Sequence, residues 1–369
     1  MQAASRPQPN VRGERDGQTD RTRSGSSPSS CPRSPLSTFL TPAMTSSPGG
    51  IGARTLPLLR HPVLRRLAQA FFVAFLLMVF AFLLIRLIPG DPAMILLGDE
   101  ATEEDVIAYR KLLGIDGSIP SQFGRYVSNL VRGDFGVSIR SREPVLSIVG
   151  KRLPVSLWLT VTTIVMTIGL ALPLGVAAAL YRRTWFGHAF QIGASVLVAT
   201  PVFFSGLLLI LLFAVQVNLA PIAGYHAGFP ANLYYLWLPA LTINFVLVPV
   251  LARILQSSIV ETSAEEFVEA AIIRGTQGWR FYWRYLLRPS LAPTIAALGY
   301  FAATVVSYAV IIEIIFNLPG LGMTLVDAVR NRDYPLVQGI VFLSGLLVVG
   351  LTFMADLVNG WLDPRAQIR

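Results

Sequence analysis

The stretch LAQAFFVAFLLMVFAFLLIRLI, residues 67–88, decides the class of fold. A helix needs about 20 predominantly apolar residues to cross the hydrocarbon core of a bilayer, and Arg86 is the only charge here. The stretch runs into Ile88-Pro89-Gly90-Asp91-Pro92 rather than into the small residues of a cleavage site, so it is not a cleavable signal peptide. Similar apolar blocks follow at residues 156–181, 189–215, 235–257, 291–316 and 336–361. The sequence therefore predicts an all-α membrane protein with six transmembrane helices.

The composition agrees with a membrane protein and argues against several other classes. Of the 369 residues, 53% are hydrophobic and 14% are charged, whereas a soluble domain carries about a quarter charged residues. The net charge is +9, but the arginines lie beside apolar blocks and not on an aromatic, basic surface of the kind that binds single strands. We therefore expect membrane lipid, and no nucleic acid, as a partner. Cys31 is the only cysteine and the three histidines are scattered, so no catalytic, metal or cofactor site is expected.

The chain divides into a tail and a membrane domain. Residues 1–58 are rich in Ser, Pro, Arg, Thr and Gly without apolar periodicity, which predicts disorder. We interpret them as a dispensable tail or the result of a start codon assigned too early; an Arg- and Ser-rich transit peptide is the alternative, opposed by three acidic residues. Residues 59–369 form the predicted six-helix domain, with an outer loop at 89–155 and a cytoplasmic segment at 262–290.

Arginine placement assigns an orientation to the six blocks. Arginines precede the first block and fill the connections after the second, fourth and sixth. The connection between the third and fourth blocks has no Lys or Arg, and the one after the fifth has only Arg330 and Arg332. Because positive residues concentrate on the inner side, both termini are predicted to be cytoplasmic.

The outer loop is expected to be partly helical. Thr102 is placed to cap a helix that runs through Leu113 and stops at Gly114. Ser121 is placed to cap a second helix, with Gly133 past its end. Prolines also fall inside several blocks, which indicates either ordinary proline within packed membrane helices or bent helices that line a path: Pro173, Pro201, Pro239 and Pro249.

The cytoplasmic segment is polar and patterned. Ser263-Ala264-Glu265-Glu266 has the spacing of a capping box, so a helix should start there and end at Gly275. It would present Phe267, Ala270, Ala271 and Arg274 along one side. A second short helix, from Trp279 to Leu287, should end before Pro289. Such a hairpin either anchors the loop at the membrane surface or docks another protein.

The pattern Glu269-Ala270-Ala271, three residues, then Gly275 resembles the cytoplasmic signature of permease subunits of ABC importers. The closest resemblance is to the first, B-type permease of the dipeptide/oligopeptide/nickel branch, over about 310 residues from Leu64 to Arg365. Further motifs support it in order: Ile88-Pro89-Gly90-Asp91-Pro92, Gly133-Asp134-Phe135-Gly136-Val137-Ser138, Phe316-Asn317-Leu318-Pro319-Gly320-Leu321-Gly322, Arg332-Asp333-Tyr334-Pro335-Leu336-Val337-Gln338-Gly339 and Asp363-Pro364-Arg365. The sequence departs from the general signature at Tyr285 and Arg288, where that family has isoleucine and proline.

The resemblance implies a type I permease bundle and a set of partners. The partners are a second, C-type permease, two cytoplasmic ABC ATPase subunits and an extracytoplasmic substrate-binding protein, in a bacterial inner membrane. It also implies that the residues which couple the permease to the ATPase are Phe267, Glu269, Ala270, Ala271, Arg274 and Gly275. The chain lacks a phosphate-binding loop, since Gly150-Lys151 is followed by Arg152, so ATP hydrolysis is expected on other subunits and the chain is not an enzyme.

Glu313 is the remaining candidate residue. It lies among isoleucines near the outer end of the fifth block, where a carboxylate facing lipid would be costly. It either lines or gates the path, or bonds to the turn at Pro319–Gly322. An ion-driven secondary transporter is the alternative function, although the middle regions of the blocks are nearly free of charge. A membrane enzyme or structural anchor is a third, for which no catalytic group is visible.

Overall fold

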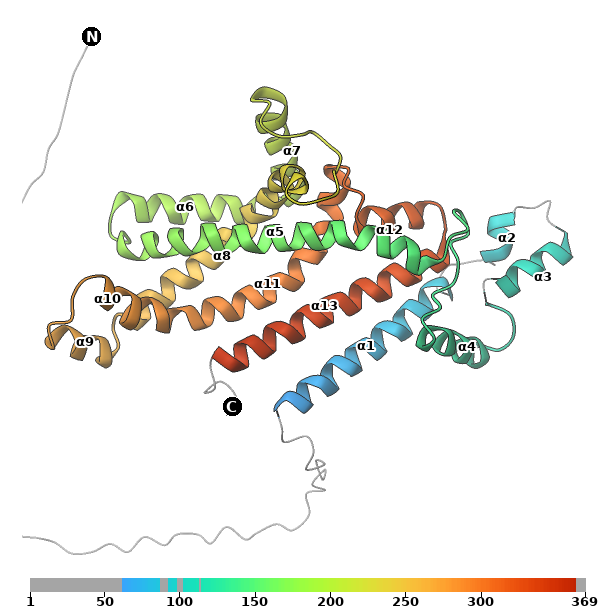
Figure 1. Ribbon diagram of the computed structural model, residues 1–369, viewed down its shortest axis with the longest axis horizontal. Coiled ribbons are helices and arrows are strands. Elements are labelled where there is room, and N and C mark those ends of the chain that lie inside the picture. The colour runs from blue at the N-terminus through green and yellow to red at the C-terminus, as the bar shows by residue number, and fades with distance from the viewer. Residues whose placement is uncertain (1–61, 87–91, 98–101, 113, 363–369) are drawn as a thin grey trace, which may run out of the picture. The chain divides into compact units, whose positions relative to one another are not determined.

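A computed structural model describes residues 62–86, 92–97, 102–112 and 114–362 (Figure 1). The described residues form helices and no named strand; one isolated bridge joins Val137 to Pro144. The all-α prediction is therefore confirmed. The predicted tail at 1–58 and the motifs at residues 88–91 and 363–365 lie outside the described residues. The described part belongs to one compact unit, residues 55–369.

Five helices of the described part are long and apolar enough to cross a membrane. They are α1 (Pro62–Arg86), α5 (Val145–Leu180), α8 (Ala231–Thr262), α13 (Tyr334–Leu362) and the continuous stretch Trp279–Ile315, whose main part is α11 (Arg288–Ile315). α5 begins eleven residues before the predicted block, so the last part of the predicted outer loop is helical. The reason is packing: Val145 and Val149 are buried against Leu336 and Ile340 of α13, and this burial holds the first turns of α5 in helical form.

The third predicted block is broken rather than straight. α6 (Trp185–Ala199) and α7 (Val202–Leu209), which continues as the π-helix η2 (Ile210–Gln216), meet at an angle of 104°. The break falls at Pro201, which lacks a backbone N–H and clashes with a preceding helical turn. After the bend, Phe229 of the following loop stacks on Trp158 of α5. By length and composition the bent pair is either one broken span or a re-entrant segment, so the described residues contain five or six spans. Pro173, Pro239 and Pro249 remain inside helices.

The core of the bundle is centred on α8. Of its apolar window 67% is buried, against 11% for α1, so α8 packs on both α5 and α11. Two hydrogen bonds join α8 to α5. Thr167 Oγ1 donates to Asn244 Oδ1 at 2.6 Å, and Asn244 Nδ2 donates to the Thr163 carbonyl at 3.2 Å. Gly175 permits the close approach, because a Cβ there would lie 2.9 Å from the Ala252 carbonyl oxygen.

Three short helices follow α1: α2 (Pro92–Leu97), α3 (Glu103–Leu112) and α4 (Ile119–Val131). Thr102 caps α3 as predicted, since its Oγ1 accepts a hydrogen bond from the Asp105 backbone N–H at 3.3 Å. α4 starts at Ile119, so the predicted cap at Ser121 is wrong; Pro120 at the helix start favours the earlier beginning. Gly133 ends α4 in the left-handed region, with φ 77°, as predicted.

Several short helices lie at the two ends of the bundle (Figure 1). α2, α3 and α4 lie at one end, where α1 ends and α13 begins. The opposite end carries α9 (Glu266–Ile273) and α10 (Trp279–Phe281), between the end of α8 and the start of α11. The predicted outer loop and the predicted cytoplasmic segment are thus separated by the length of the membrane-spanning helices.

Candidate functional site

The first half of the candidate site is α9, and its start differs from the prediction. Ser263 is not a cap for α9, because its hydroxyl donates to the Val260 carbonyl at 2.6 Å and Ser263 itself ends α8. Glu265 occupies the N-cap position of α9 without a side-chain cap hydrogen bond. The predicted capping box is therefore wrong. The reason is that α8 runs to Thr262, so Ser263 caps the end of α8 and not the start of α9.

The end of α9 agrees with the prediction. Gly275 has φ 76°, a conformation that side chains with a Cβ rarely adopt. Its N–H donates to the Ile272 carbonyl at 2.9 Å, and the Thr276 N–H donates to the Ala271 carbonyl at 3.1 Å. These two bonds form a Schellman motif, which satisfies the last carbonyls of the helix and turns the chain sharply away.

The structure divides the predicted coupling residues into exposed and buried ones. Glu269, Arg274 and Gly275 are exposed, Phe267 is 45% exposed and Ala270 is half-buried. Ala271 is buried at 1%, as is Val268 at 2%. Ala271 is therefore not at the surface of this structure, and its role in coupling stays a prediction. Val268 and Ala271 are three residues apart, so they lie on one face of α9. This buried face points toward the rest of the protein, where α9 contacts the helical segment Tyr282–Leu287.

The predicted second short helix is part of a longer one. α10 continues as the π-helix η3 (Tyr282–Leu287) and then directly as α11, so the helix does not end before Pro289. Pro289 lies in the first turn of α11, where the wider π turns precede it and a missing N–H does least harm. Tyr285, one of the two departures from the signature, stacks on Phe281 with ring centroids 6.1 Å apart.

Two contacts attach this segment to the bundle. Ser290 Oγ donates to Thr262 Oγ1 at 3.0 Å, which joins the start of α11 to the end of α8. Leu287 and Leu291 pack against the buried Leu255 and Ile259 of α8. The end of α8 and the start of α11, between which this segment lies, are thus joined to each other.

Glu313 lies at the other end of α11 and is 0% exposed. Its Oε1 accepts from Ser156 Oγ at 2.5 Å, and its Oε2 accepts from the backbone N–H groups of Gly322 and Met323 at 2.7 and 3.1 Å. The carboxylate therefore bonds to the turn that begins α12 (Leu321–Arg330), one of its two predicted roles. A cavity of about 60 Å³, room for little more than water, adjoins it. A path or gate role stays a prediction.

Asp333 lies in the Arg332–Gly339 motif, and the sequence alone predicts no role for it. It is 2% exposed and its carboxylate accepts hydrogen bonds from the Ser138 hydroxyl and from the Ile139 N–H at 3.1 Å. It also accepts from the Leu336 N–H at 3.4 Å at the start of α13. The sequence could have predicted Asp333 as a helix cap, because an aspartate shortly before a proline such as Pro335 is typical of a helix N-terminus. The outer-loop and Arg332–Gly339 motifs thus meet at this carboxylate.

No group of three or more His, Cys, Asp or Glu side chains within the described ranges could hold a metal ion. Comparison with known proteins instead points to transport. Residues 171–368 match the family described as binding-protein-dependent transport system inner membrane component, and residues 58–160 match the N-terminal model of the same group.

Three curated relatives match this chain over nearly their whole lengths. A probable peptide ABC transporter permease protein, y4tP, of Sinorhizobium fredii is 32% identical over 308 residues, 83% of this chain and 98% of that protein. The glutathione transport system permease proteins GsiC of Escherichia coli K12 and Salmonella paratyphi A are each 31% identical over 307 residues, 83% of this chain and 99% of theirs. These matches do not support an ion-driven transporter. The chain belongs to the inner membrane components of binding-protein-dependent transport systems, and is a permease subunit of an ABC importer.

Proposed function

We propose that this permease forms half of the translocation path for peptides or a related solute, paired with a second, C-type permease. The relatives named for peptide and glutathione transport support this class of solute. ATP hydrolysis takes place on separate subunits, and a substrate-binding protein delivers the solute. The path would run beside α5, α8 and α11, with Glu313 as a candidate lining or gating residue.

The observation that carries the coupling proposal is the two-sided character of α9. Val268 and Ala271 hold the helix to the chain, while Phe267, Glu269 and Arg274 are exposed. An apolar ring flanked by one negative and one positive side chain suits a groove on a protein partner. Because α9 is tied to α8 and α11, an ATPase subunit that grips this surface would move both helices together.

The orientation proposed for α9 is cytoplasmic. Arg280, Arg284 and Arg288 recur at a spacing of four residues on the same segment and are exposed, and no acidic residue lies between Gly275 and Pro289. Such a row of arginines favours the inner side of the membrane. With six spans, both termini would then also face the cytoplasm.

Cysteine crosslinking tests the docking directly. In a Cys31→Ser background, Phe267→Cys should form a crosslink to the ATPase subunit of the assembled importer. Val131→Cys is the matched control, because Val131 is an apolar residue 83% exposed on α4, at the opposite end of the bundle. A crosslink from position 131, or none from position 267, would contradict the proposal.

Uptake measurements test coupling rather than contact. Glu269→Lys and Gly275→Arg should leave membrane insertion and complex assembly intact but abolish ATP-dependent uptake of a tripeptide. The controls are Glu261→Lys, an equal charge change on an exposed residue of α8, and Gly278→Arg, a glycine with φ 75° that suffers the same backbone strain outside α9. Equal loss of uptake in a control and its partner would mean that strain or charge, not docking, is responsible.

A further inference from the structure

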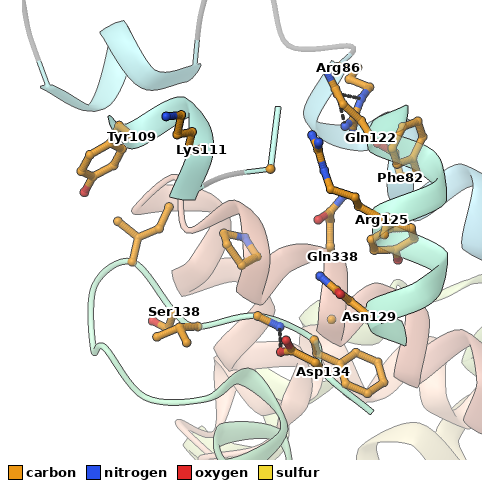
Figure 2. A pocket seen from close by; sticks show the side chains of 18 of the residues that line it. Phe82, Arg86, Tyr109, Lys111, Gln122, Arg125, Asn129, Asp134, Ser138 and Gln338 are labelled. Carbon is orange, nitrogen blue, oxygen red and sulfur yellow. Dashed lines mark hydrogen bonds between the residues drawn. The ribbon is translucent and has the colours of Figure 1, made fainter. Parts of the chain in front are cut away.

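A pocket of about 730 Å³ lies at the end of the bundle opposite α9 (Figure 2). The end of α1, the helices α3 and α4, the loop at residues 134–142 and the first turns of α13 form its walls. Its volume is within the range of about 300–1,000 Å³ that is usual for sites of small organic molecules. Nothing in the coupling mechanism or in the Glu313 contacts uses this pocket.

The charges of the pocket are unequal and separated. Four cations line it, Arg86, Lys111, Arg125 and Arg142, but one carboxylate, that of Asp134. Arg125 forms an ion pair with Asp116 at 2.8 Å; for the other three cations the described residues supply no carboxylate partner. Figure 2 shows Asp134 at the lower edge of the pocket, Lys111 at the upper left and Arg86 at the upper right.

Asp134 is prepared to bind a cation with one of its oxygens. Its Oδ1 accepts the Gly136 N–H at 2.9 Å, which fixes the carboxylate, while Oδ2 has no partner among the described residues. Arg86 is also fixed, because its guanidinium lies 3.5 Å from the Phe82 ring centroid and its Nε donates to Gln122 Oε1 at 3.0 Å. Preorganised charges of this kind cost a ligand little ordering entropy.

The space between the charges is amphipathic. Burial raises the pKa of Tyr126 to about 12, so at neutral pH its hydroxyl stays protonated and uncharged beside Arg86. Tyr109 and Phe135 add aromatic surface, and the Asn129 side chain has no hydrogen-bond partner among the described residues. Such walls suit a backbone of amide groups with small side chains better than a bare inorganic anion.

We propose that this pocket binds a small dipolar solute with a free carboxylate near Lys111 and a free ammonium group near Asp134. Short peptides are the class it would take, a choice that rests on the proposed function of the permease. The pocket would be a solute site on the permease itself, additional to the one on the binding protein.

Binding to the permease–ATPase complex in nanodiscs, without nucleotide or binding protein, tests the proposal by calorimetry. The probes are trialanine, its C-terminal amide and its N-acetyl derivative. Trialanine should bind in a saturable manner, and each blocked form should bind more weakly by up to about fivefold, as expected for the loss of one partly exposed ionic contact. No saturable binding, or equal binding of all three probes, would overturn the proposal.

Two variants assign the binding to this pocket. Lys111→Gln should weaken trialanine binding and make the acid and the amide equivalent. Asp134→Asn retains an oxygen for the Gly136 N–H and should make the free and acetylated peptides equivalent. Lys151→Gln and Glu143→Gln are the controls, because Lys151 and Glu143 pair with each other at 2.7 Å outside the pocket. Both control variants should bind trialanine as the wild type does.

Two further outcomes separate the alternatives. If phosphatidylglycerol in the nanodisc abolishes trialanine binding and Lys111→Gln restores it, a lipid headgroup occupies the pocket and the proposal is wrong. Glu269→Lys should leave trialanine binding unchanged, because the two sites lie at opposite ends of the bundle. Failure of the pocket would therefore not affect the coupling proposal, and failure of coupling would not affect the pocket.

Discussion

The Ser156 hydroxyl donates a hydrogen bond of 2.5 Å to the carboxylate of Glu313, across a separation of 157 residues in sequence. The same hydroxyl oxygen accepts from the Leu321 N–H at 2.9 Å. Three helices, α5, α11 and α12, thus share one buried polar centre. A fully buried carboxylate is costly unless it is hydrogen-bonded, and here two backbone N–H groups and one hydroxyl satisfy it.

Removal of this carboxylate should loosen the centre. Glu313→Ala leaves the donors of Ser156, Gly322 and Met323 without their acceptor, at a cost of about 1–3 kcal/mol for each buried group left unsatisfied. The thermal midpoint of the purified importer should fall clearly for Glu313→Ala and less for Glu313→Gln, which retains one acceptor oxygen. Glu261→Ala, at an exposed position, should leave it unchanged.

The same pair of variants separates structure from gating. If Glu313 lines the path, Glu313→Gln should reduce uptake in a complex whose midpoint is close to that of the wild type. If Glu313→Gln leaves both the thermal midpoint and the rate of uptake unchanged, the role of Glu313 is structural and consists of its contacts with the turn that begins α12.

Two glycines of the Phe316–Gly322 motif make room for this centre. A Cβ at Gly320 would lie 2.2 Å from Glu313 Oε1, and a Cβ at Gly322 would lie 2.4 Å from the Val310 Cα. Because backbone cannot rotate away as a side chain can, Gly322→Ala should be the more damaging, by several kcal/mol, on the scale of severe overpacking. Gly150→Ala is the control, since nothing lies within 4 Å of its added carbon. Yields of folded protein after detergent extraction would reveal the order.

Asp333 should hold the outer loop against α13. Asp333→Ala removes the acceptor for Ser138 and Ile139, so the loop should detach from α13 and its backbone at the exposed Arg140 and Arg142 should become flexible enough for trypsin to cleave. Faster cleavage at these arginines is expected for Asp333→Ala than for Asp333→Asn, which keeps one acceptor. Asp327→Ala, on the exposed side of α12, should cleave at the wild-type rate; if all three behave alike, the loop is held by other contacts.

The α5–α8 contact should depend on Asn244. Thr167→Val keeps the shape of the side chain but removes its hydrogen bond to Asn244, at a cost of about 0.6–1.7 kcal/mol for a polar contact between membrane helices. Thr304→Val is matched, since Thr304 is half-buried and its hydroxyl bonds only within its own helix, to the Tyr300 carbonyl at 3.2 Å. Unfolding in increasing denaturant would compare the two variants, and equal stabilities would contradict the assigned contact.

Local chemistry made several elements of the candidate site predictable. Gly275 and Gly133 end their helices in the left-handed conformation, because glycine alone adopts it without strain. Thr102 caps α3 for an equally local reason. The failures at Ser121 and Ser263 arise because a helix start is a competition between neighbouring positions, and the preceding helix or a proline decides it.

The apolar blocks and the family motifs can be read directly from the amino-acid order. The blocks predict helices because, in a bilayer of fixed thickness, only a helix satisfies the backbone groups of so apolar a stretch. Only the tertiary structure decided that α9 buries Ala271 while exposing Glu269, that the third span bends by 104°, and that Asp333 and Glu313 anchor segments far away in the chain. The physical reason is that burial and hydrogen-bond partners depend on which helices pack together, and spacing along one helix does not contain that information.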